Sequence, residues 1–351
     1  MTFELLSGAR PLFLPFDGVE PRFAAPPKHL GGGCSVLGKV EIGTGAVIAA
    51  GAVLRGDGHF VRIGGGFSIG QNGTVHIAHD VYPAIIGDRT AVGRNAVVHA
   101  CTVGSDCVIE DNAVILDGSV VEDGVLVEEG STVFPKSKLA SGFIYAGSPA
   151  KPVRALMPEE RDERAQRLRQ AALKAPALAA STGPYVSAAP SAFIAKTASL
   201  AGRIALRDQS SIFFGCVFDA GQYEIAIGEN TNIQDNTRIL CSKGGAVIGR
   251  DVTAGHNVLI QDCSIGERSL IGIGATVASG TIIEEEVLLA AGAVTLAGQT
   301  LERGWVWGGG PARPLARLDD GKRTMFATII DLYCGYAQAY KRAQDERASR
   351  G

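Results

Sequence analysis

An aliphatic residue at almost every sixth position is the feature that most constrains the fold of this chain. One series runs from Ile42 to Val133, and a second runs from Leu200 to Leu301. Sixfold spacing matches neither the 3.6-residue period of an amphipathic helix nor the twofold alternation of a half-exposed strand. It is typical of a parallel β-helix, in which each hexad supplies one short strand and one corner and three hexads close a coil of about 18 residues. We therefore predict a mainly β protein.

The repeated aliphatic side chains are expected to point into the β-helix and form its core. The first series comprises Ile42, Ile48, Leu54, Ile63, Ile69, Val75, Ile86, Val92, Val98, Val103, Ile109, Ile115, Val121, Val127 and Val133. The second comprises Leu200, Leu206, Ile212, Phe218, Ile227, Ile233, Ile239, Ile248, Ala254, Ile260, Ile265, Ile271, Val277, Ile283 and Leu289. Intervening Gly, Asn and Asp residues are expected at tight corners that need positive φ, namely Gly43, Gly45, Gly104, Asp111, Asn112, Gly266 and Gly274.

The two series predict two domains in tandem. Residues 158–174 open with Pro and two acids and carry basic residues later, which favours a helix, and a second helix is expected at about 319–350. Residues 175–190 are rich in Ala, Pro and Ser, as in a linker. We expect a first β-helix with its helix at residues 1–174, a linker at 175–190, and a second, diverged β-helix with its helix at 191–351.

Composition narrows the classes of function. The net charge of −3 gives no electrostatic basis for binding nucleic acid. No apolar run reaches the length that spans a membrane, and the first residues lack the pattern of a signal peptide, so a cytoplasmic location is expected. Seven cysteines without a C-x-x-C pair argue against a disulfide framework or a cysteine zinc cluster.

Several motifs resemble the γ-class carbonic anhydrases and their relatives among the hexapeptide-repeat proteins. In the first copy these are Arg55-Gly56-Asp57, VHIAHD, VGRNAVVHACTVG and YAGSPAKPVRAL, and in the second they are AIGENTNIQDNT, VTAGHNVLIQDCSIG and WGGGPARPL. The resemblance implies left-handed β-helices that assemble as trimers. It also implies a zinc ion at each subunit interface, bound by two histidines of one subunit and a third of its neighbour.

The hexads place His76 and His99 on one face of the first β-helix. Arg55, His76 and His99 each directly follow an inward aliphatic residue, and each lies three hexads from the next. Neighbouring strands lie about 4.8 Å apart. Both imidazoles are therefore expected to reach one metal ion at about 2.0 to 2.1 Å.

The third histidine of the family pattern is missing from the first copy. Its position is occupied by Arg94, whose charged guanidinium cannot bind a cation. In the second copy the three matching positions are Leu240, His256 and Gln261, so that copy keeps only the histidine that the first copy has lost.

Other family positions show the same complementary loss. The glutamine that the family places near the metal-bound water is Gln234 in the second copy and Gly70 in the first. The Arg-Gly-Asp segment is intact in the first copy, where Arg55 and Asp57 are expected to be salt-bridge residues of the interface, but not in the second. The reverse interface, in which Leu240 and Gln261 face Arg94, is expected to hold no metal. The Arg94 guanidinium is expected to pair there with an acid or to bind an anion.

The resulting hypothesis is a metal site split between a first and a second domain, with His76, His99 and His256 as ligands and Gln234 beside the metal-bound water. Three neutral imidazoles leave one open position, at which zinc lowers the pKa of water to about 7. By resemblance, the reaction is the reversible hydration of CO2, catalysed by zinc with Fe²⁺ or Co²⁺ as alternatives. The expected assembly is a homo-oligomer of trimeric domain rings, with a related subunit as another possible member and no nucleic acid or membrane partner.

Two other classes of function remain open at this stage. One is an acyl-CoA-dependent acyltransferase of the hexapeptide-repeat type, in which His76 or His99 acts as general base without a metal. The other is a non-catalytic structural module in a larger assembly. Bound metal and the effect of removing the histidines distinguish these classes from the hydratase.

Overall fold

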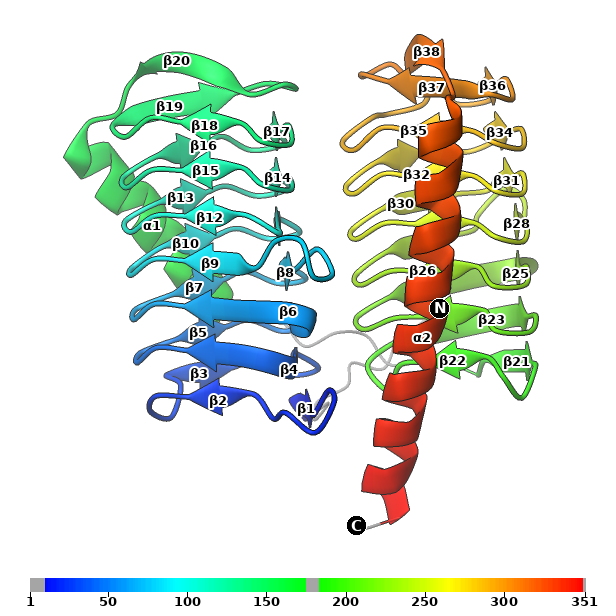
Figure 1. Ribbon diagram of the computed structural model, residues 1–351, viewed down its shortest axis with the longest axis horizontal. Helices are drawn as coiled ribbons and strands as arrows, with labels where there is room; N and C mark the ends of the chain where they lie inside the picture. The colour runs from blue at the N-terminus through cyan, green and yellow to red at the C-terminus, as the bar shows by residue number, and fades with distance from the viewer. Residues whose placement is uncertain (1–9, 175–182, 350–351) are drawn as a thin grey trace. The chain divides into compact units, whose positions relative to one another are not determined.

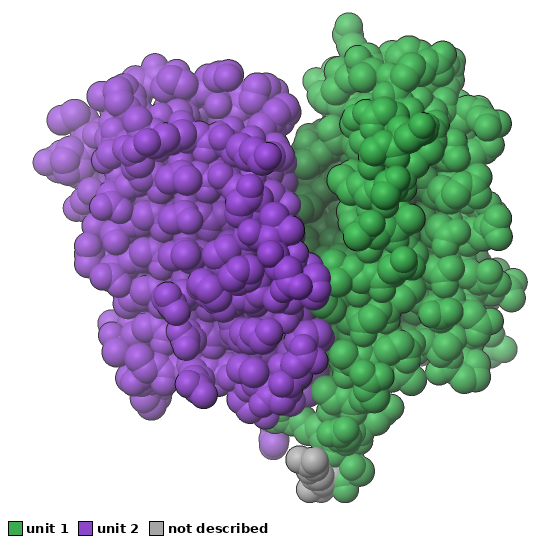
Figure 2. All heavy atoms as spheres, in the orientation of Figure 1, with its two compact units in different colours: residues 1–5, 179–351 green, residues 6–178 purple. Residues whose placement is uncertain are grey.

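The chain folds into two compact units, each described here by itself. A computed structural model describes residues 10–174 and 183–349. The N-terminal unit falls within residues 6–178, and the C-terminal unit falls within residues 179–351 (purple and green in Figure 2). Both are left-handed parallel β-helices followed by a helix, as the hexads and the family resemblance predict (Figure 1).

The N-terminal unit contains a 12-stranded and an 8-stranded sheet. The larger sheet comprises β1 (Leu12–Leu14), β2 (Arg22–Phe23), β4 (Ser35–Ile42), β6 (Val53–Ile63), β8 (Thr74–His76), β9 (Ala84–Ile86), β11 (Val97–His99), β12 (Thr102–Val103), β14 (Val114–Ile115), β15 (Val120–Val121), β17 (Thr132–Val133) and β18 (Lys138–Leu139). The smaller comprises β3 (His29–Leu30), β5 (Val47–Ile48), β7 (Ser68–Ile69), β10 (Ala91–Val92), β13 (Val108–Ile109), β16 (Leu126–Val127), β19 (Phe143–Ala146) and β20 (Lys151–Ala155).

The long strand β6 joins two faces of this β-helix. Its first residues pair with β8 and its last residues pair with β9. The larger sheet therefore bends around a corner and supplies two faces, while the smaller sheet supplies the third. Among the described strands of this unit the pairings are parallel, except for the final pair, β19 with β20, which is antiparallel.

The C-terminal unit repeats this plan with a 10-stranded and an 8-stranded sheet. The larger comprises β21 (Tyr185–Ala188), β23 (Ser199–Leu206), β25 (Val217–Ile227), β27 (Arg238–Leu240), β28 (Ala246–Ile248), β30 (Leu259–Gln261), β31 (Ser264–Ile265), β33 (Thr276–Val277), β34 (Ile282–Ile283) and β36 (Thr300–Leu301). The smaller comprises β22 (Phe193–Ile194), β24 (Ser211–Ile212), β26 (Asn232–Ile233), β29 (Thr253–Ala254), β32 (Leu270–Ile271), β35 (Leu288–Leu289), β37 (Trp305–Gly308) and β38 (Arg313–Arg317). Residues 175–182 of the expected linker lie outside the described residues. Residues 185–188 of that linker form β21, which pairs with β23 of the second β-helix.

The repeated aliphatic residues form the core of each unit. Every member of the first series lies in one buried cluster and every member of the second series in another. The coils are not uniform in length, because Val98 pairs with Val75 on one side and with Ile115 on the other. These partners lie 23 and 17 residues away in the sequence, and the longer coil contains the loop around residues 77–83.

Several corner glycines serve close packing of the coils, not positive φ. Gly45, Asn112 and Gly274 do adopt positive φ, of 75°, 60° and 68°. Gly43, Gly104, Asp111 and Gly266 do not, so that part of the prediction was wrong for them. A Cβ on Gly104 would lie 2.7 Å from the backbone nitrogen of Asp123 on the next coil, and such a contact leaves room only for a hydrogen atom.

One helix covers the 8-stranded sheet of each unit (Figure 1). Helix α1 (Pro158–Leu173) buries Leu168 against Ala91, Val108 and Leu126, and helix α2 (Asp320–Ser349) contacts β22, β26 and β29. Both helices match the predicted ranges to within one or two residues. In the described part of the chain, no helix combines the length and the apolar character that crossing a membrane requires.

Candidate metal centre

The candidate site of the N-terminal unit is a pair of histidines on adjacent coils. Strands β8 and β11 pair in parallel, and His76 lies directly opposite His99. Arg55 occupies the corresponding position one coil earlier, since Leu54 pairs with Val75. Both imidazoles are buried. The hexad columns therefore place these three side chains on one face.

Each imidazole is held by a carboxylate through one ring nitrogen and faces the other imidazole through its second. His76 Nε2 lies 2.9 Å from Asp57 Oδ1, and His99 Nδ1 lies 2.6 Å from Asp117 Oδ1. The remaining nitrogens, His76 Nδ1 and His99 Nε2, are 3.3 Å apart. The pair thus lies between two acids, with two ring nitrogens converging at its centre.

These contacts decide where the protons of the neutral imidazoles lie. A carboxylate accepts a hydrogen bond, so Asp57 and Asp117 place the N–H groups on His76 Nε2 and His99 Nδ1. Two lone pairs then face each other across 3.3 Å, an arrangement that needs a cation or a shared proton between them. Two nitrogens at 2.0 to 2.1 Å from one tetrahedral ion are separated by about 3.3 to 3.4 Å. The donor set and its spacing therefore fit a divalent metal.

Electrostatics keeps both acids ionised. Burial would raise the pKa of the Asp57 carboxyl, but Arg55 and His76 beside it hold that pKa well below its usual range. The guanidinium Nη1 of Arg55 forms an ion pair with Asp57 Oδ2, and both side chains are fully buried. Desolvation likewise opposes ionisation of Asp117, and its contact with His99 lowers the pKa of that carboxyl. Ionised acids favour the proton positions described above.

The C-terminal unit contributes one buried histidine in a comparable setting. His256 follows β29, and its Nδ1 lies 3.2 Å from Asp235 Oδ2. On the other side of the ring, Nε2 lies 3.5 Å from the hydroxyl of Tyr333 in α2. Asp235 is fixed in turn, because its Oδ1 accepts a hydrogen bond from the backbone N–H of Phe214 at 3.1 Å.

Gln234 lies on the coil next to His256, immediately after β26. Its Nε2 donates to Asn232 Oδ1 at 3.1 Å, and the amide of Asn232 donates to Thr253 Oγ1 at 2.9 Å. This chain of hydrogen bonds fixes the orientation of a buried amide. Because Nε2 donates to Asn232, Oε1 is the end of the Gln234 amide that can accept a further hydrogen bond.

The positions that have lost their histidines are occupied as follows. Leu240 and Gln261 pair with each other across β27 and β30, in the same register as His76 and His99. Arg94 forms an ion pair with Asp111, with 2.7 Å between Nη2 and Oδ2, and its side chain is 62% exposed. The structure thus brings Arg55, Asp57, His76 and His99 together in the N-terminal unit and separates Arg94 from them by pairing it with Asp111.

Sequence reasoning missed three side chains at these sites. They are Asp117 at His99, and Asp235 and Tyr333 at His256. Asp117 could have been found, because it follows His99 by 18 residues and so falls one coil further on. Tyr333 could not, because the hexads do not determine how α2 lies on its sheet.

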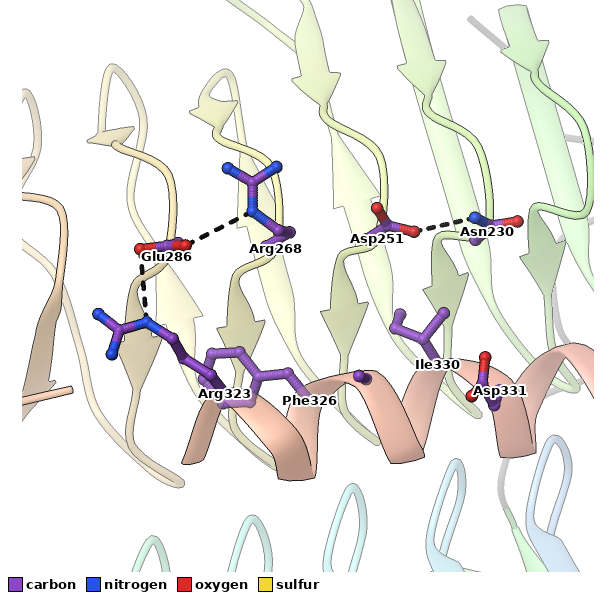
Figure 3. A pocket seen from close by; sticks show the side chains of 9 residues that line it. Asn230, Asp251, Arg268, Glu286, Arg323, Phe326, Ile330 and Asp331 are labelled. Carbon is purple, nitrogen blue, oxygen red and sulfur yellow. Dashed lines mark hydrogen bonds and ion pairs between the residues drawn. The ribbon is translucent and has the colours of Figure 1, made fainter. Parts of the chain in front are cut away.

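A cavity beneath α2 in the C-terminal unit is a weaker candidate (Figure 3). It has a volume of about 330 Å³ and is lined by Asn230, Asp251, Arg268, Glu286, Arg323, Phe326, Ala327, Ile330 and Asp331. Three of its charged groups pair with one another, since Glu286 lies 3.6 Å from Arg268 and 3.5 Å from Arg323. These pairings engage both arginines that line the cavity.

Known proteins resemble this chain in sequence and in fold. No family model matches it. It is 43% identical over 155 residues to γ carbonic anhydrase 2, mitochondrial, of Arabidopsis thaliana, across 42% of this chain and 56% of that protein. It is 39% identical over 132 residues to protein YrdA of Escherichia coli, across 36% of this chain and 72% of that protein. A putative acetyltransferase from Desulfovibrio desulfuricans, 12% identical, aligns over 90% of this chain and 81% of that one with a TM-score of 0.51, and this shows the fold alone.

The alignments agree with the motifs and the coils. The chain spans little more than half the length of the plant relatives that it matches. It spans nearly three quarters of the bacterial relative. With its hexad cores and its two β-helices, the chain belongs to the γ-class carbonic anhydrase-like family of hexapeptide-repeat proteins, as a tandem duplication.

Proposed function

We propose that this protein is a metal-dependent hydratase of the carbonic anhydrase type, which interconverts CO2 and bicarbonate. The observation that carries the proposal is the convergence of His76 Nδ1 and His99 Nε2 at 3.3 Å, each on an imidazole held by a carboxylate. Histidines that bind metals commonly donate their second N–H to a carboxylate in this way. The curated names of the plant relatives support the choice of reaction.

The third ligand in this proposal is His256, contributed by a C-terminal unit. The N-terminal unit has Arg94 where the family pattern has its third histidine, whereas the C-terminal unit keeps that histidine and loses the other two. His256 also has a carboxylate, Asp235, at one ring nitrogen, as His76 and His99 do. Independent decay of the two copies would have no reason to leave complementary halves.

The chain's own residues perform three tasks in this mechanism. His76, His99 and His256 bind the cation through neutral imidazoles, and their acids fix the proton positions. Gln234, with its amide fixed by Asn232, orients water or bicarbonate through Oε1. A cation bound by three imidazoles lowers the pKa of water toward 7 and so supplies a nucleophile at neutral pH. Zinc suits this donor set, and Fe²⁺ and Co²⁺ are the alternatives.

The proposed oligomer follows from the division of the metal site between the two kinds of unit. A site that needs one half from each kind of unit forms only where an N-terminal and a C-terminal unit meet. We infer an oligomer built from trimeric rings of units. Because a ring of three cannot alternate two kinds, a mixed ring holds one complete site, and a related subunit is a possible third member.

Bound metal per chain tests the proposal directly. Elemental mass spectrometry of anaerobically purified protein is combined with the absolute mass from light scattering and with stopped-flow CO2 hydration. We expect reproducible metal that is lost in His76→Ala, His99→Ala and His256→Ala. The control is His79→Ala, because His79 is 40% exposed, forms an ion pair with Asp80 and is not among the proposed ligands. Undiminished metal in His256→Ala would refute the split site, and a folded oligomer without metal or hydratase activity would refute the function.

A further inference from the structure

We propose that Asp117 is a positioning residue of the metal centre, which holds the proton of His99 on Nδ1 and so keeps the lone pair of Nε2 directed at the metal. This inference rests on the proposed function. It concerns a carboxylate that lies outside every family motif recognised in the sequence.

The contact is short and its geometry is fixed by the coils. Asp117 Oδ1 lies 2.6 Å from His99 Nδ1. The backbone around Asp117 is held on both sides, since the N–H of Gly118 donates to Ala100 O and the N–H of Lys136 donates to Asp117 O, each at 2.8 Å. A carboxylate anchored to the coils before and after it has little freedom to leave the imidazole.

Asp57, the acid that contacts His76, also has a structural role. Asp57 is fully buried and also forms the ion pair with Arg55, so replacing it would strand a buried guanidinium. Asp117 has a side chain that is 41% exposed. Its replacement should therefore change the imidazole without unfolding the unit, and this makes Asp117 the acid whose role can be isolated.

Without Asp117, His99 has a competing arrangement that excludes the metal. A neutral histidine in water favours the form with its proton on Nε2. That proton would point at His76 Nδ1, which lies 3.3 Å away, and would form an N–H···N hydrogen bond. The same two nitrogens would then bond to each other and not to a cation. Asp117 decides between these two arrangements.

The test uses full-length Asp117→Ala, with Asp117→Glu to restore the carboxylate. Asp111→Ala is the matched control, because Asp111 is a corner acid of the same β-helix that pairs with Arg94. ¹⁵N–¹H NMR of the metal-free protein reports which nitrogen of His99 carries the proton. Competition titration with Zn²⁺ or Co²⁺ reports affinity.

We expect Asp117→Ala to move the His99 proton to Nε2 and to weaken metal binding about 10- to 100-fold, as for other acids that orient metal-binding histidines. Asp117→Glu should recover part of the affinity, and Asp111→Ala should match wild type in both measurements. An Asp117→Ala protein with the proton still on Nδ1 and affinity within about twofold of wild type would overturn the inference. Wild type that binds no metal would refute the proposed function instead, because the NMR readout needs none.

Discussion

Arg55 provides the sharpest test of the electrostatics beneath the site. Its guanidinium pairs with Asp57, and neither side chain is exposed. Replacing Arg55 with Met keeps the volume but leaves a buried carboxylate without its countercharge. Removing one partner of a buried pair costs about 3–5 kcal/mol. For a unit of this size each kcal/mol lowers the melting temperature by about 2–4 °C, so we expect a decrease of about 6–20 °C.

The pH dependence of stability follows from the pKa of Asp57. In the folded protein that pKa is held below its unfolded value of about 3.9, so the stabilisation is fully present above that pH and is lost as the pH falls through the folded pKa. In Arg55→Met the electrostatic contribution of the guanidinium is lost, so the pKa of Asp57 rises toward its unfolded value. The difference in stability between wild type and variant should therefore be largest near neutral pH and shrink in acid.

Urea unfolding followed by far-UV circular dichroism measures this effect. Both tryptophans, Trp305 and Trp307, belong to the C-terminal unit, so tryptophan fluorescence reports that unit separately. The double variant Arg55→Met/Asp57→Leu should regain most of the lost stability, because it removes both charges together. A loss below about 1 kcal/mol in the single variant would refute the reasoning, since a buried ion pair cannot be broken so cheaply.

Three further predictions follow from packing and burial. Gly87→Ala should lower the free energy of unfolding in urea by about 3 kcal/mol, because its Cβ would lie 2.5 Å from a backbone nitrogen of the next coil. Gly130→Ala has open space around it and should cost only about 1 kcal/mol, for its positive φ. Equal costs would contradict the explanation by close approach of the coils. Glu110→Gln should weaken the docking of α1 by about 1.5–3 kcal/mol, because this buried carboxylate accepts hydrogen bonds from two arginines of α1 at 2.6 and 2.8 Å. Hydrogen exchange of the α1 amides measures the loss, and unchanged protection would argue against this docking contact. Burial raises the pKa of the Cys107 and Cys334 thiols to about 11. At pH 8 these two thiols should therefore react with iodoacetamide about 100-fold more slowly in the native protein than in urea. Rapid labelling of either thiol in the native protein would show that it is not shielded.

Local patterning was enough to predict the β-helices and the histidine column. Whether a side chain points inward depends on its place in a hexad, and hexads are counted along the chain. The core series and the pairing of His76 with His99 both follow from that count. The corner glycines were predicted less well, because the need for glycine at Gly104 comes from the backbone of a different coil.

The sequence by itself determined which residues of each unit face the core and which histidines share a face. Only the tertiary structure decided what those histidines contact. The coils differ in length, at 17 and 23 residues, and this shifts their corners relative to one another. The partner of an outward-pointing polar side chain therefore depends on coil length and on its rotamer as well as on its hexad position. For this reason the coil count places Asp117 one coil beyond His99, but only the folded unit shows that the two side chains make contact. The contact of Tyr333 with His256 lies outside the repeat altogether, because Tyr333 belongs to α2.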